Sequence, residues 1–208
     1  MSTWHGFLDD LRPAASPPLD TPYVGLRAVR DTDLPSVAEG AGPLRVVLTG
    51  GAAQVAGPVA LAERRGLSLG ALDTALRDAA DPAGNARRVA AALDAAPLPD
   101  GARVHVRLPV DGPPTPAGLA ALDELAVLEA VAVLPADLSA LEGWLDAALD
   151  REVPVSLVSG TPAQAADAVL VAARLWGDPG DAAVGRRFVL SWLTDDTVAA
   201  VTHLEGLA

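Results

Sequence analysis

Four side chains in the middle of the chain combine an imidazole, a carboxylate and two cations that could act on an anionic metabolite. His105 and Arg107 lie two residues apart in the apolar run 103–108, so on a strand they share one face. Asp73 and Arg77 lie at or beyond the end of an earlier apolar run, where α/β proteins place their chemistry. If these residues converge, they could bind the substrate of a lyase, isomerase or hydrolase. If His105 instead faces covering helices, it is structural, and Asp73 and Arg77 are equally consistent with a solvated ion-pair cluster.

A second group of residues could bind a ligand without catalysing a reaction. Gly50 and Gly51 stand between a predicted strand and a predicted helix, so their N–H groups could hold a phosphate or carboxylate. The dinucleotide fingerprint is incomplete, because alanine replaces its later glycines, and nucleotide binding is therefore only a third hypothesis. Asp9 and Asp10 precede a proline-rich segment and could reach the mouth of a pocket.

The absence of two residue types excludes several kinds of enzyme. All 15 basic side chains are arginine, so there is no lysine amine for a Schiff base, for a pyridoxal-phosphate site or for a P-loop. There is also no cysteine, which excludes disulfides, thiolate catalysis and thiolate metal sites. His5 and His203 are isolated in the sequence, so we predict no metal site, and the sequence identifies no cofactor.

The charge balance limits the partners. Twenty-seven acidic residues give a formal net charge of −12, which disfavours nucleic acid and anionic membranes as partners. The sequence contains no apolar stretch long enough to span a membrane, and its first ten residues are acidic where a secretory signal would be basic. We expect a cytoplasmic protein that contacts neither nucleic acid nor membrane.

A repeated strand-then-helix pattern must position these residues. Asp81-Pro82, Thr115-Pro116 and Thr161-Pro162 each follow an apolar run and open an Ala/Leu-rich stretch, which is typical of a capped helix start. Ser139 and Glu142 further predict a capping box. Six strands are predicted at 23–29, 44–49, 67–72, 103–108, 130–134 and 153–158, with helices at 52–65, 82–96, 116–127, 138–150 and 162–176.

This alternation predicts parallel strands joined by helical crossovers in an α/β fold. We expect a single domain in three parts: residues 1–43 form a helix, a proline-rich segment and the first strand, residues 44–180 the core, and residues 181–208 helices. The N-terminal helix is predicted from apolar residues at Trp4, Phe7, Leu8 and Leu11. Six strands make an incomplete TIM-type barrel or an open sheet, and its uncovered edges predict a homo-oligomer, most simply a homodimer.

Five sets of short segments, read in order along the chain, form a recognisable pattern. They are Phe7-Leu8-Asp9-Asp10 with Pro17-Pro18, Val24-Gly25 with Asp33-Leu34-Pro35, Leu72-Asp73-Thr74-Ala75-Leu76-Arg77, Val104-His105-Val106-Arg107-Leu108-Pro109 and Arg151-Glu152-Val153-Pro154-Val155-Ser156. Together they resemble a family of uncharacterised TIM-barrel-like proteins from high-GC bacteria, and the resemblance implies a barrel of βα repeats. In the family a late strand carries a Lys and a His-His pair that are replaced here by Val155 to Thr161, and the preceding strand carries a further Lys where this chain has Val131 to Pro135.

The loss of these Lys and His residues favours a protein without the catalytic set of its relatives. We therefore expect a non-catalytic binding or assembly component that self-associates and takes a small anionic ligand. The alternative is an enzyme acting on an anionic metabolite at the carboxyl ends of the strands, so whether the chain is an enzyme stays open at this stage.

Overall fold

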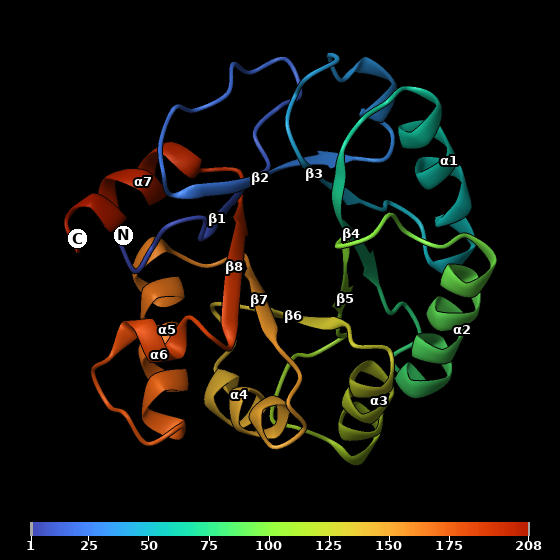
Figure 1. The fold of residues 1–208 in the computed structure, drawn as a ribbon. Helices are drawn as coiled ribbons and strands as arrows, with labels where there is room; N and C mark the ends of the chain where they lie inside the picture. The colour runs from blue at the N-terminus through green and yellow to red at the C-terminus, as the bar shows by residue number, and fades with distance from the viewer. Residues whose placement is uncertain (1, 208) are drawn as a thin grey trace.

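The computed structural model describes residues 2–207, and its central feature is a closed barrel of eight parallel strands (Figure 1). Each strand pairs with the next in sequence, and the last pairs with the first through Leu8 to Asp10 against Trp192 to Thr194. The strands are β1 (Leu8–Asp10), β2 (Val24–Arg30), β3 (Leu44–Val47), β4 (Leu69–Ala75), β5 (Arg103–Arg107), β6 (Val131–Pro135), β7 (Val155–Val158) and β8 (Val189–Thr194).

Helices surround the barrel, and three of them begin at the predicted pairs of a capping residue and a proline. The side chains of Asp81, Thr115 and Thr161 each accept a hydrogen bond from a backbone N–H of the first turn that they cap. The helices are α1 (Ala56–Arg64), α2 (Pro82–Ala95), α3 (Pro116–Val127), α4 (Leu141–Leu149), α5 (Pro162–Leu175), α6 (Ala182–Gly185) and α7 (Thr197–Glu205), with short 3₁₀ turns η1 (Leu34–Ser36) and η2 (Ala52–Gln54).

The predicted capping box lies at a different helix. Helix α4 begins after Ala140, without a side-chain cap from Ser139. The reciprocal bonds form instead at the start of α5, between Thr161 and Gln164. Both helices have the right residue types, so spacing alone did not distinguish them.

The prediction of an incomplete barrel or open sheet with six strands is wrong, because two further strands close the ring. The first is β1, in the segment predicted as an N-terminal helix. Trp4, Phe7 and Leu8 do have helical spacing, but they are buried in a turn and a short strand whose central residue, Asp9, faces the barrel interior. A three-residue strand with a charged inward position has no alternation of apolar and polar residues to reveal it.

The second missed strand is β8, in the tail predicted to be entirely helical. Almost all of Val189–Thr194 is buried. Strands of a parallel barrel are covered by helices outside and by side chains inside, so they form continuous apolar runs that resemble buried helices. Helices α6 and α7 flank this strand, so the helical prediction for residues 181–208 is correct only on either side of it.

The barrel is covered unevenly. Between β1 and β2, and between β2 and β3, the chain forms extended segments and the turn η1 in place of an α-helix, whereas α1 to α5 cover most of the remaining circumference (Figure 1). Helix α7 packs beside β1 and near the start of the chain. No helix within residues 2–207 has the length and apolarity needed to cross a membrane.

Two kinds of interior result from this arrangement. An apolar layer of small and branched side chains lies between the strands and the helices. Helices α5 and α6 can pack closely against each other because they are rich in alanine and glycine. Inside the ring of strands, polar side chains replace much of the apolar packing that usually fills such a barrel. The candidate site is in this second interior.

Candidate functional site

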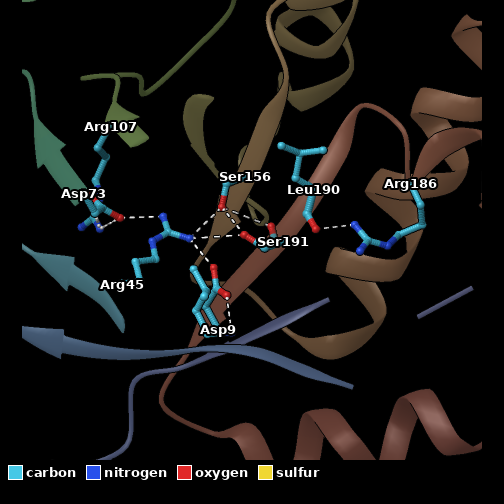
Figure 2. Close-up of polar contacts among 9 residues, drawn as sticks. Asp9, Arg45, Asp73, Arg107, Ser156, Arg186, Leu190 and Ser191 are labelled. Atoms are coloured by element: carbon cyan, nitrogen blue, oxygen red, sulfur yellow. Dashed lines mark hydrogen bonds and ion pairs between the residues drawn. The ribbon is translucent and has the colours of Figure 1, made fainter. Parts of the chain in front are cut away.

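Arg45 is the centre of a polar network inside the barrel (Figure 2). It is fully buried, and its Nη1 lies 2.6 Å from Oδ2 of Asp9 while its Nη2 lies 2.6 Å from Oδ2 of Asp73. Nη1 also donates to Oγ of Ser156 at 3.0 Å and to Oγ of Ser191 at 3.3 Å. One guanidinium from β3 therefore links β1, β4, β7 and β8 across the barrel.

The two carboxylates compensate the buried charge of Arg45. Burial alone would lower the pKa of Arg45, but the nearby charges of Asp73 and Asp9 and their hydrogen bonds raise the pKa above its ordinary value. Ser156 and Ser191 complete the network, with their hydroxyl oxygens 2.9 Å apart. Asp9 also accepts a hydrogen bond from the backbone N–H of Leu26 at 3.3 Å. A charge inside a protein is tolerated when it is paired and hydrogen-bonded in this way.

Arg107 extends the network toward the carboxyl ends of the strands. Its Nη2 lies 3.3 Å and 3.4 Å from the two oxygens of Asp73, longer than the 2.6 Å bond from Arg45 to the same group. One third of the Arg107 side chain is exposed, and its Nε is buried without a hydrogen-bond partner. Arg107 is thus an incompletely used cation at the edge of the network.

His105 lies on the same strand but deeper in the barrel. It is 3% exposed, and its Nδ1 is buried without a partner among the described residues. Burial, with the charges of Arg45 and Arg103, holds the pKa of His105 well below 6.5. The ring is therefore neutral at physiological pH.

The structure brings Asp73, His105 and Arg107 together but leaves the fourth predicted catalytic residue apart. Asp73 lies within β4, which extends further than predicted, and pairs in register with His105. Arg77 follows the strand and is exposed, and its guanidinium donates to the backbone oxygen of Thr49. Polar side chains do come together inside the barrel, but the residue at their centre is Arg45, which was not predicted.

The predicted ligand-binding residues are also divided. Asp9 belongs to the interior network, whereas Asp10 bonds Arg12 and, at 2.7 Å, the hydroxyl of Thr197. Burial alone would raise the pKa of Asp10, but the bonds from Arg12 and Thr197 outweigh it and lower the pKa. Asp10 therefore holds the segment after β1 against the start of α7.

Gly50 and Gly51 precede a short 3₁₀ turn, whereas the α-helix predicted to follow them directly begins only at Ala56. They lead into the three-residue turn η2, and the side chain of Gln54 occupies the space beside Gly50. Arg77 lies next to Gly51. The closed barrel also differs from the open doubly wound sheet that a dinucleotide loop accompanies.

The residues that sequence reasoning missed are Arg45, Ser156 and Ser191. Each interrupts an apolar run on a strand. A strand buried on both faces has no solvent-facing position for a charged residue, so an arginine there must meet an acid inside the protein. This signal was available in Leu44-Arg45-Val46-Val47 but does not identify the partner strands.

Within residues 2–207, no three His, Asp or Glu side chains lie close enough together to hold a metal ion. Comparison of the chain with models of protein families, with curated proteins and with solved structures found no match. The TIM-type βα barrel is therefore described on the structure alone.

Proposed function

We propose that this protein is a non-catalytic barrel that binds a small anion at the carboxyl-terminal mouth of its strands. The observation that carries the proposal is Arg107, a cation at that mouth with one third of its side chain exposed and only long contacts to Asp73. A phosphate or carboxylate would complete the hydrogen bonding of its guanidinium.

The surroundings of this mouth also favour negative charge. Helices α2, α3 and α5 begin there, so their positive dipole ends point toward the same end of the barrel. Arg30 ends β2 on the inward side, two residues after Ala28, whose neighbour in register is Arg45. Two of the acids near this mouth accept hydrogen bonds from backbone N–H groups: Asp31 accepts from Thr32 and Thr49, and Asp78 from the loop before α2.

Binding is favoured over catalysis because the interior carboxylates are already paired. Asp9 and Asp73 are both held by Arg45 at 2.6 Å, and Asp73 is shared with Arg107. A general base needs a free lone pair directed at its substrate, whereas Oδ2 of each of these carboxylates is directed at the guanidinium of Arg45.

The finer expectations from sequence remain part of the proposal. We propose that the chain is a shortened relative of the high-GC bacterial family and acts in the cytoplasm. Self-association is retained as a prediction, although the closed ring leaves no unpaired strand edge to motivate it. A homodimer would have to use the outer helices or the extended segments before β3.

The test is a binding measurement on two matched variants. Inorganic phosphate and citrate are titrated against the full chain, with thermal unfolding and calorimetry as readouts. A ligand at 100 times its Kd should stabilise the native state by about 2.7 kcal/mol. Arg107→Gln should lose at least tenfold in affinity, since a charged hydrogen bond contributes about 1.5–3 kcal/mol.

Arg87→Gln is the control, because Arg87 is an exposed arginine on α2 whose loss changes the net charge equally. If neither anion binds, or if both variants lose affinity equally, the proposed function is wrong.

The enzyme hypothesis is a second candidate, favoured by the proximity of His105 to Asp73 in register. It requires turnover of a phosphorylated or carboxylated metabolite that is lost in His105→Gln while binding persists. Binding without turnover across such a panel would support the non-catalytic proposal.

A further inference from the structure

The opposite, amino-terminal mouth of the barrel contains a cavity that the proposed function does not use. Its volume is about 260 Å³, just below the roughly 300 Å³ at which drug-sized pockets begin, so it fits a small metabolite. It is lined by Asp9 and Ser191 of the interior network, by His105, and by Arg103 at the start of β5.

Small residues form much of the wall of this cavity, in contrast to the layers of Val, Ile and Leu that normally fill a βα barrel. Here Gly6, Gly25, Gly70 and Ala71 line the cavity, and Gly25 is required by the fold because a Cβ there would lie 2.7 Å from the backbone oxygen of Gly6. Polar groups of the barrel interior are thereby left facing an open space.

Arginines lie close to the one carboxylate that lines this cavity. Asp9 is already compensated by Arg45, and Arg186 also acts on it electrostatically (Figure 2). Arg186 donates to the backbone oxygens of Val189 and Leu190, and Leu190 itself lines the cavity. Arg103, an exposed residue at the entrance, bonds no carboxylate among the described residues.

The imidazole ring of His105 is a polar group available for hydrogen bonding in this cavity. The His105 ring lines the cavity, and its buried Nδ1 has no hydrogen-bond partner among the described residues. A neutral imidazole has one N–H donor and one acceptor, so it can bond an oxygen of a ligand without adding charge. Ser191, on β8, contributes a hydroxyl-bearing side chain to the lining of the same cavity.

We propose that the amino-terminal cavity is a second ligand site, which binds a small oxyanion, a carboxylate or a phosphate, through Arg103 with His105 as a neutral hydrogen-bonding partner. The site is separate from Arg107, which lies at the other end of the barrel interior. Its ligand enters from the face opposite to the one where barrel enzymes act.

The test uses NMR signals of the histidine rings, because the chain has only three histidines. His105→Gln assigns the His105 signal by its disappearance. Inorganic phosphate and, separately, glycolate are then titrated against the full chain. We expect a saturable shift of the His105 signal with at least one of them, the two arms deciding between phosphate and carboxylate. Arg103→Gln, at an exposed position that leaves the fold intact, should weaken this shift at least tenfold in apparent affinity.

Arg107→Gln separates the two sites. It should leave the His105 titration unchanged, whereas it should weaken binding at the carboxyl-terminal mouth at least tenfold. A His105 signal that responds to neither anion overturns the second site, as does a response that survives Arg103→Gln or disappears in Arg107→Gln. None of these outcomes depends on whether the first site exists.

Discussion

Replacing Arg45 with methionine should be the most destabilising conservative change in the barrel interior. Methionine approximates the length of the arginine stem but supplies no charge, so Asp9 loses its ion partner inside the protein. Removing one partner of a buried ion pair costs about 3–5 kcal/mol. At roughly 2–4 °C per kcal/mol for a domain of this size, the midpoint of thermal unfolding should fall by roughly 6–20 °C.

A second variant tests whether charge is the cause. In Arg45→Met with Asp9→Asn, the unpaired carboxylate is removed, while Asp73 keeps its contact with Arg107 at 3.3 Å. This double variant should therefore be more stable than Arg45→Met alone, by about 1–3 kcal/mol, the cost of an unsatisfied buried group. Urea unfolding followed by far-UV circular dichroism measures the difference.

The control is Arg87→Met on the surface of α2. Arg87 pairs with Glu124 in solvent, so its loss should change stability by less than about 1 kcal/mol. Equal stability of Arg45→Met and Arg87→Met would show that the buried ion pairs of Arg45 do not stabilise the barrel. If Arg45→Met is destabilised but Asp9→Asn restores nothing, the loss arises from packing and the electrostatic explanation is refuted.

Three further predictions concern pH, packing and capping. His105 stays neutral in the folded protein, whereas in the unfolded chain it takes up a proton below about pH 6.5. The free energy of unfolding should therefore decrease as the pH falls below that value, by up to about 1.4 kcal/mol per pH unit. In urea titrations at several pH values, His105→Gln should remove this slope, and His5→Gln, at an exposed position, should keep it. Gly185→Ala should cost about 1–3 kcal/mol or more in the same assay, since its Cβ would lie 1.9 Å from the backbone oxygen of Val169; an unchanged midpoint would contradict this close approach. Thr161→Ala should cost about 0.5–2 kcal/mol through loss of the α5 cap, and stability equal to wild type would mean that the cap contributes nothing.

The local pattern of residues accounts for most of the fold. The caps at Asp81, Thr115 and Thr161 are local signals, in which a side chain bonds the backbone a few residues away, and the structure has all three. The six predicted strands correspond to β2 through β7 because each is a short apolar run in the sequence. Strands β1 and β8 were missed because one is too short and the other too uniformly apolar to show a period.

The candidate site was foreseen only in part, for a similar reason. Alternation along β5 places His105 and Arg107 on one face, and this is a property of adjacent residues. Which face lies inside the barrel depends on ring closure, to which β1 and β8 contribute strands far apart in the chain. Arg45 meets Asp9 across 36 residues and Ser191 across 146, contacts that no local pattern encodes.

Order along the chain was thus enough to establish a parallel βα architecture, because caps, prolines and apolar periods act over a few residues. The number of strands in the ring, the location of the buried charge and the separation of the two mouths depended on long-range packing. A charged side chain inside a closed barrel must find its counter-charge on whichever strand the ring brings opposite it, and that choice exists only once the chain has folded.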